Sequence, residues 1–208
     1  MAESFRAISL SHLRAPVEIR ELIYLREPTC KALLGKLKDL LDIKEAMVFS
    51  TCNRTEVYYT SEEDLSLEII ACICVENGIL ETEKFIQYFD TYHESEAIPY
   101  LFEVSMGLHS MVFGDLQIAN QVKQAYSWAH ESDMAGAFLH RVMHTVFHTN
   151  KRVQQETPFR DGAASASYAA AELASSLGEA YRDAKVLVVG LGEMGADVAR
   201  NLDMEDFG

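Results

Sequence analysis

The pattern of hydrophobic and polar positions divides the chain into a first part of short apolar runs and a second part with helical spacing. Short runs rich in β-branched and aromatic side chains favour strands. Four such runs predict strands, over residues 5–10, 46–50, 55–60 and 84–93. Residues 29–41 and 64–78 repeat apolar side chains three and four positions apart, which predicts helices. The order strand, helix, strand, strand, helix, strand predicts an α+β fold, a split βαβ sandwich.

The second part of the chain is helical in pattern from residue 95 to residue 156, where three stretches carry apolar residues three and four apart. Pro158 is expected to end the last helix. A helix rich in small residues should follow, and then a strand, a glycine turn and another helix. We therefore expect three parts, namely a domain over residues 1–158, a connector helix over 159–182 and the start of a Rossmann domain over 183–208.

The negative charge of the chain is concentrated in one segment. A net charge of −14 argues against a nucleic-acid partner, because phosphate contacts rely on Lys and Arg. However, residues 61–103 hold eleven acids and one lysine, whereas residues 1–60 have nine basic and eight acidic residues. A local basic face is therefore compatible with the composition. With no apolar run of about 18 residues and no secretory signal, we expect a cytoplasmic protein.

A glycine pattern near residue 190 predicts a dinucleotide-binding loop. Gly190, Gly192 and Gly195 follow the predicted strand and open the predicted helix. Such glycines permit a tight turn, close approach of a pyrophosphate, and close packing of helix on strand. The predicted loop comprises Gly190, Leu191, Gly192, Glu193, Met194 and Gly195. The alternative is an accidental glycine turn. Since the ribose-reading residue lies about 20 positions further on in such folds, we expect an incomplete nucleotide domain.

Cys52 is the candidate nucleophile among four cysteines. It lies in a turn between two predicted strands, and its polar neighbours are Thr51, Asn53 and Arg54. A nearby guanidinium favours the thiolate, which is the reactive form. Cys72 and Cys74 lie in an apolar helix and are expected to pack in the core. Cys30 begins a helix, where mild activation is expected. A purely structural turn cysteine is the alternative for Cys52.

Three histidines form a row on one predicted helix. His140, His144 and His148 are four residues apart, so they share a face. Three histidines in one row cannot readily converge on one ion, and no HExxH motif is present. We therefore expect no metal site and favour a polar helix face, with a contact to RNA or to a protein partner as the alternative.

Six segments, taken in order, resemble glutamyl-tRNA reductase. They are SHLRAPVEIRE (11–21), STCNRTEVY (50–58), GLHSMVFGDLQIANQVKQAY (107–126), TNKRVQQET (149–157), DGAASASYAAAELA (161–174) and VLVVGLGEMG (186–195). The proteins of this family are longer and end in a helical dimerisation domain. The resemblance covers nearly the whole chain, and STCNRTEVY matches the family's nucleophile motif almost residue for residue.

The resemblance implies a covalent mechanism. The Cys52 thiolate attacks the ester that joins glutamate to its tRNA, and a thioester forms. NADPH, held at residues 190–195, then supplies hydride, and the product is glutamate-1-semialdehyde, a precursor of tetrapyrroles such as porphyrins and haem. Covalent catalysis divides one difficult step into two easier ones.

The resemblance also assigns the substrate pocket. Arg54 would pair with the side-chain carboxylate of the substrate, which suits a planar guanidinium. The other positions assigned to glutamate binding are Thr51, Asn53, Ser110, Asp115, Leu116, Gln117 and Gln121. His109 stands where the family usually has Asp, and Asp115-Leu116 replaces Glu-Pro.

Tyr100 takes the place of the family's active-site histidine and is assigned to the catalytic set. A phenol with a pKa near 10 is a poor base at neutral pH. We expect its hydroxyl within hydrogen-bond reach of the Cys52 pocket, with His93 and His109 as alternative replacements. Pro99 is expected to disturb the helix start.

The partners implied are glutamyl-tRNA(Glu) as substrate, glutamate-1-semialdehyde aminomutase as a candidate protein partner, and a second copy in a full-length homodimer. Two other readings remain. One is a module that binds glutamyl-tRNA or a partner without reducing it. The other is a fragment of an unrelated Rossmann dehydrogenase, against which the segment at residues 107–126 argues.

Overall fold

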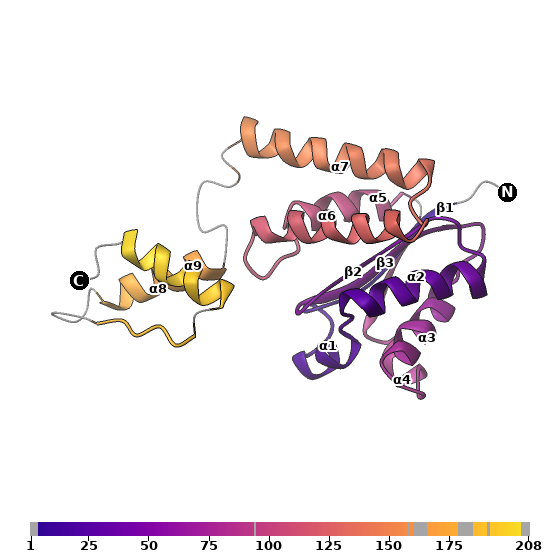
Figure 1. Cartoon of the computed structure of the whole chain (residues 1–208), viewed down its shortest axis with the longest axis horizontal. Helices are drawn as coiled ribbons and strands as arrows, with labels where there is room; N and C mark the ends of the chain where they lie inside the picture. The colour runs from indigo at the N-terminus through magenta and orange to yellow at the C-terminus, as the bar shows by residue number, and fades with distance from the viewer. Residues whose placement is uncertain are drawn as a thin grey trace.

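A four-stranded antiparallel sheet forms the centre of the molecule (Figure 1). The computed structural model describes residues 4–93, 95–157, 159, 166–178, 185–190 and 192–204. The strands are β1 (Ser4–Ser11), β2 (Ala46–Thr51), β3 (Arg54–Ser61) and β4 (Phe89–His93). They pair in the order β2-β3-β1-β4, and every pairing is antiparallel. The predicted α+β fold and the first three strands are confirmed, whereas the strand predicted over residues 84–93 is confirmed only as β4, because Glu83–Ile86 forms a short helix.

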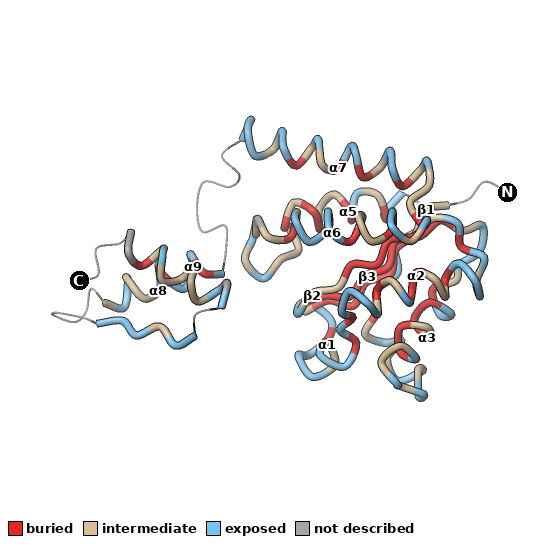
Figure 2. The backbone as a smooth tube through the Cα atoms, viewed as in Figure 1, coloured by how far each residue is buried: buried red, intermediate tan, exposed pale blue. Residues whose placement is uncertain are grey.

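Helices cover both faces of the sheet (Figure 1). On one face lie α2 (Glu27–Leu41), α3 (Ser66–Glu76) and the short α4 (Glu83–Ile86), and on the other α5 (Ala97–Ser105), α6 (Leu116–Glu131) and α7 (Ala137–Glu156). Because successive side chains of a strand alternate in direction, Tyr58 of β3 stacks with Tyr100 of α5 while Tyr59 reaches Ser66 of α3. Both faces are covered, so β1, β2 and β3 are buried almost continuously (Figure 2), whereas only Phe89 is buried in the edge strand β4.

Two local features differ from expectation. The segment after β1 forms a short helix, α1 (Val17–Ile23), which the hydrophobic pattern did not predict. Pro99 does not disturb α5, because it lies in the first turn of that helix, where a backbone N–H has no intrahelical partner to lose.

The C-terminal part contains α8 (Ala166–Gly178) and α9 (Glu193–Met204), which pack against each other. The strand predicted before the glycine turn is absent from the described residues, since residues 185–190 join no ladder. Leu187 and Val189 there are 86% and 90% exposed. A strand needs a neighbour for its hydrogen bonds, and this segment has none among the described strands. Within the described residues, no helix is long and apolar enough to cross a membrane.

Candidate active site

Cys52 occupies the tip of the β2–β3 hairpin. Thr51 pairs with Arg54, so Cys52 and Asn53 form the two-residue turn between the strands. The backbone N–H of His12, just after β1, donates to the carbonyl of Asn53 at 2.9 Å and ties the turn to the neighbouring strand. The turn is therefore held by the sheet on both sides while the Cys52 side chain is exposed.

The other three cysteines are poor nucleophiles. Burial raises the pKa of Cys30 to about 12 and that of Cys74 to about 11, and burial also raises the pKa of Cys72. The expected activation of Cys30 at the start of α2 is therefore wrong, because the thiol is fully buried and close to Glu27. Among the four thiols, only that of Cys52 is exposed.

A cavity of about 310 Å³ opens beside Cys52. Its lining residues are Val17, Arg20, Glu21, Tyr24, Cys52 and Asn53. Arg20 donates from Nε to the carbonyl of Cys52 at 3.3 Å and from Nη1 to the carbonyl of Ala15 at 2.8 Å. The guanidinium that binds the Cys52 residue is thus supplied by α1, whereas the sequence pointed to Arg54.

Arg54 is buried and forms an ion pair with Glu56. Its Nη1 is 2.8 Å from Glu56 Oε1, and both side chains are almost fully buried. Its Nη2 donates to the backbone carbonyl of His109. Burial is the largest influence and opposes the charge, but Glu56 and two nearby tyrosines outweigh it, so the pKa of Arg54 is raised. Arg54 is therefore a permanent, internally paired cation.

Glu56 is the centre of a buried polar network. Its Oε1 accepts from Ser9 Oγ at 2.9 Å and from the Tyr100 hydroxyl at 2.8 Å, and its Oε2 accepts from the Tyr58 hydroxyl at 2.5 Å. Together with Arg54, four donors thus satisfy one carboxylate. A buried charge is tolerated when it is paired and fully hydrogen-bonded.

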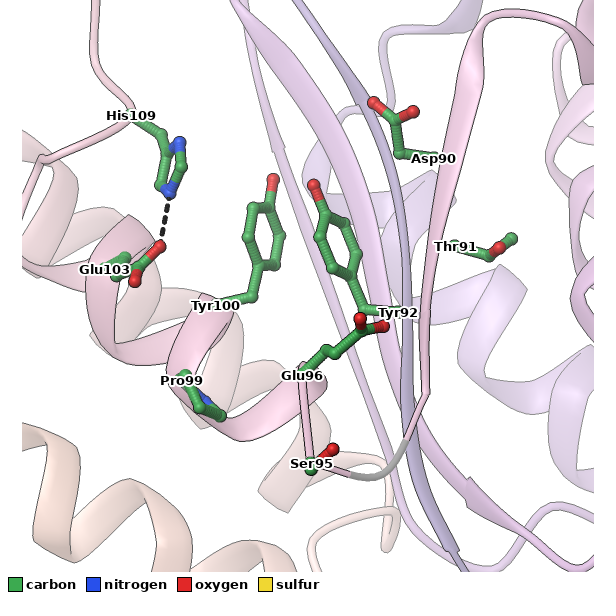
Figure 3. Close-up of a pocket in the computed structure, with 9 residues that line it drawn as sticks. All are labelled: Asp90, Thr91, Tyr92, Ser95, Glu96, Pro99, Tyr100, Glu103 and His109. Carbon is green, nitrogen blue, oxygen red and sulfur yellow. Dashed lines mark hydrogen bonds and ion pairs between the residues drawn. The ribbon is translucent and has the colours of Figure 1, made fainter.

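Tyr100 projects from α5 beside Tyr92 (Figure 3), and its hydroxyl belongs to the network around Glu56. Its ring stacks on Tyr92 with centroids 3.9 Å apart, and its hydroxyl lies 2.8 Å from Ser9 Oγ. Burial raises its pKa, and the Glu56 carboxylate adds to the rise. Tyr100 is therefore a neutral hydrogen-bonding group at neutral pH. Among the described residues, no hydrogen bond joins it to Cys52, and its expected role in the thiol chemistry stays a prediction.

A second cavity, of about 550 Å³, lies over the ring of Tyr100 (Figure 3). Its lining residues are Asp90, Thr91, Tyr92, Ser95, Glu96, Pro99, Tyr100, Glu103 and His109. His109 Nε2 is 2.7 Å from Glu103 Oε2, and its ring is tilted against that of Tyr100. His93 instead takes a hydrogen bond from Arg6 at the far end of β1. Of the two alternative histidines, only His109 adjoins Tyr100.

The remaining pocket residues lie in and after the loop over residues 107–115. Gly107 has φ +80°, and a Cβ there would lie 2.8 Å from the backbone nitrogen of Asp115. The loop closes on itself through this glycine. Asp115 caps α6 by accepting from the backbone of Gln117 at 2.9 Å. Ser110 Oγ is buried without a protein partner among the described residues.

Four assigned residues have less defined roles. Thr51 Oγ1 accepts from the backbone of Asn53 at 3.2 Å and stabilises the turn. Gln121 is exposed on α6, and the structure does not describe the side chain of Leu116. Gln117 Nε2 lies 3.8 Å from Met194 Sδ and so connects this loop region to the start of α9.

His12 is a site residue that the hydrophobic pattern missed. Burial lowers its pKa, and the positive charges of Arg54 and Arg20 and the ring of His109 lower it further. Its Nδ1 is buried without a protein partner in the described part of the chain. The sequence feature that could have indicated His12 is its position in the segment SHLRAPVEIRE, immediately after the strand that adjoins the cysteine turn.

Two positions of the predicted glycine loop favour glycine in the structure. Gly190 has φ +106°, and a Cβ on Gly195 would lie 2.0 Å from the carbonyl oxygen of Gly190. Only glycine fits at position 195, because any Cβ there would clash with this oxygen. Gly192 precedes α9, Met194 is exposed, and Leu191 lies outside the described residues together with the side chain of Glu193. The residues present therefore fit a phosphate-binding turn at a helix N-terminus.

The histidine row is an exposed helix face. His140, His144 and His148 are exposed on α7, and the hydroxyl of Tyr126 lies 2.6 Å from His140 Nδ1. Among the described residues, no group of three potential ligands is arranged to hold a metal ion.

The fold and site place the chain among proteins in which a split βαβ domain presents an exposed cysteine at a hairpin tip. A family model for the N-terminal domain of glutamyl-tRNA(Glu) reductase matches residues 8–157. The chain is 54% identical over 202 residues to a glutamyl-tRNA reductase of Cytophaga hutchinsonii, and 38% identical over 188 residues to that of Desulfatibacillum aliphaticivorans. These alignments cover 97% and 90% of the chain, and 48% and 43% of the relatives.

A solved structure gives the same result. Glutamyl-tRNA reductase from Methanopyrus kandleri superposes with a TM-score of 0.71 at 29% identity, over 98% of this chain and 47% of that one. The chain belongs to the glutamyl-tRNA reductase family, whose members are oxidoreductases of tetrapyrrole biosynthesis. It spans about half the length of the curated relatives it matches.

Proposed function

We propose that this chain performs the acyl-transfer step in the NADPH-dependent reduction of glutamyl-tRNA to glutamate-1-semialdehyde. The observation that carries the proposal is Cys52, the one exposed thiol of the four, at the tip of a hairpin within the matched domain. Since the chain spans about half of its relatives, the complete reduction is proposed for a protein of the relatives' length.

In the proposed acylation, the sulfur of Cys52 forms a bond to the carbonyl carbon of the glutamyl ester. The bond from that carbon to the ribose oxygen breaks, and the tRNA leaves after its oxygen takes a proton. His12 is the candidate proton acceptor for the thiol, because its backbone binds Asn53 and its lowered pKa favours the neutral ring. Arg20, bound to the carbonyl of Cys52, places positive charge near the thiolate.

Glutamate recognition is proposed on the α5–α6 side of the turn. Arg54 and Glu56 give this region a fixed charge distribution, and the two N–H bonds of Arg54 in use leave further donors on its guanidinium. Ser110 Oγ is a buried hydroxyl without a protein partner among the described residues, which makes it available to a ligand. Tyr100 would act as a neutral donor that positions Glu56.

Residues 190–195 would hold NADPH, which supplies hydride to the acylated cysteine. The support is the close approach of Gly195 to Gly190 and the start of α9 at Glu193, within this loop. The α9 N-terminus would offer backbone N–H groups to a pyrophosphate. Met194 lies beside Gln117, so the loop and the candidate glutamate site face the same region.

A second candidate function is binding of glutamyl-tRNA without reduction. It is favoured by one observation, namely that residues 185–190 form no sheet with other described residues. Mass spectrometry after mixing the chain with glutamyl-tRNA separates the two candidates. A glutamyl adduct on Cys52 supports acyl transfer, whereas retained tRNA with no adduct supports binding alone.

A further inference from the structure

The wall of the Cys52 cavity that α1 supplies is chemically unlike the glutamate side. Val17 and Glu21 are four positions apart and share one side of α1, and Tyr24 is the extended residue that follows the helix. All three line the cavity with Cys52, and Val17 and Tyr24 are 47% and 39% exposed. Val17 and Tyr24 are thus partly exposed to solvent beside Cys52. No residue of the Glu56 network or of the glycine loop lines this cavity.

The chemistry of acyl transfer requires a leaving group next to the nucleophile. Reacting atoms must approach to roughly 3–3.5 Å, so both halves of the substrate lie against Cys52 during the reaction. In the proposed function one half is glutamate and the other is the terminal nucleoside of the tRNA. Arg54 and its partners lie on the α5 side of the hairpin, while the α1 cavity contains the thiol and no part of that network.

We propose that the α1 cavity binds the 3′-terminal nucleoside of the tRNA, with its base stacked on Tyr24. This inference rests on the proposed function and assigns a site for the leaving group. Proteins hold single-stranded nucleotides by stacking bases on aromatic side chains, and the aliphatic side chain of Val17 extends the apolar surface of Tyr24.

The two charged residues of the cavity fit the rest of a nucleotide. Arg20 uses Nε and Nη1 to bind the carbonyls of Cys52 and Ala15, and its Nη2 has no protein partner among the described residues. That nitrogen is available to the phosphate that precedes the terminal nucleoside. The exposed carboxylate of Glu21 can accept from a ribose hydroxyl, as acidic residues do in other nucleotide sites.

The test compares two acyl donors, 3′-O-glutamyl adenosine and the ethyl thioester of glutamate, which carries the same acyl group without a nucleoside. Mass spectrometry follows the glutamyl adduct on Cys52. The readout is the acylation rate constant with 3′-O-glutamyl adenosine divided by the rate constant with the ethyl thioester. In the Tyr24→Ala variant this ratio should fall about 5- to 150-fold, the range expected for loss of one base–aromatic stack. The Tyr24→Phe variant keeps a stacking ring and should keep the wild-type ratio.

Leu22→Ala is the matched control, because Leu22 is exposed on α1 but does not line the cavity. Its ratio should equal that of the wild type. An unchanged ratio in Tyr24→Ala, or an equal loss in Leu22→Ala, would overturn the nucleoside site. Wild-type protein that forms no adduct with either donor would instead contradict the acyl-transfer function itself.

Discussion

The hydroxyl of Tyr100 lies 2.8 Å from Oε1 of Glu56, although 44 positions separate the two residues in the chain. This bond joins the first helix after the sheet to the strand that begins two residues beyond Cys52. Because Arg54 and Ser9 bind the same oxygen, the position of α5 and that of the strand end are coupled through one carboxylate. A tyrosine at this position thus has a structural role that does not depend on proton transfer.

Acylation should be confined to one cysteine. Cys52→Ser should abolish formation of the glutamyl thioester, because serine at this turn cannot supply a thiolate. Cys30→Ser and Cys74→Ser should keep it, because both thiols are buried and their raised pKa values keep them protonated. Peptide mapping by mass spectrometry gives the modified position. A comparable loss of adduct in a folded Cys30→Ser variant would count against this assignment.

Arg54→Lys should destabilise the protein despite keeping the charge. Different guanidinium nitrogens bind Glu56 and the carbonyl of His109, so a lysine is expected to lose at least one of the two bonds, and loss of a hydrogen bond to a charged partner costs about 1.5–3 kcal/mol. Urea denaturation measures the change in the free energy of unfolding. The control is Arg14→Lys, whose partially exposed ion pair with Asp90 should change that free energy by less than about 1 kcal/mol. Equal losses of unfolding free energy in the two variants would show that the buried ion pair stabilises the protein no more than the exposed one.

The stability of the domain should fall on mild acidification, partly through His12. Burial, Arg54 and Arg20 hold the pKa of His12 below its ordinary value of 6.5, so the unfolded chain takes up a proton before the folded chain does. The stabilising contribution of the neutral His12 ring is therefore fully present above pH 6.5, and it is lost as the pH falls through the lowered pKa of the folded state. Urea denaturation from about pH 7 to about pH 5 should show a steeper loss in the wild type than in His12→Gln. Parallel curves would contradict the role given to burial of this ring.

The 208-residue chain should form the glutamyl adduct without producing semialdehyde. Residues 185–190 have no partner strand in the described part of the chain, so nothing there fixes a nicotinamide at reacting distance from Cys52. Incubation with glutamyl-tRNA and NADPH, followed by assay of aldehyde and of free glutamate, tests this. Free glutamate is expected, because water can resolve the thioester. Aldehyde formed at the rate of a full-length relative would refute the prediction.

The strands and long helices could be predicted because their hydrophobic periods are local. The exposed segment before Gly190 shows the limit of such reasoning, since its sequence suits a strand but a ladder also needs a neighbour. The seven-residue helix α1 is too short to display a period, and with it the cavity beside Cys52 was missed.

The network around Glu56 shows a second limit. Alternation in β3 places Arg54, Glu56 and Tyr58 on one face, which the sequence does imply. It does not imply that Ser9 and Tyr100 complete the site, because their separations of 47 and 44 positions from Glu56 are bridged only in the folded chain. The pairing of Arg54 inside the protein was unforeseen for that reason.

The first turn of α7 receives its cap from the other end of the domain. Glu45, which precedes β2, accepts from the backbone nitrogens of Phe138 and Leu139 at 3.2 and 2.6 Å, and a Cβ on Gly136 would lie 2.4 Å from its Oε1. These contacts span more than 90 positions. Because Glu45 immediately precedes β2, α7 can receive this cap only when its first turn lies beside the start of that edge strand. The first turn of α7 thus depends on one edge of the sheet for its cap, so a change at Glu45 should loosen the start of that helix.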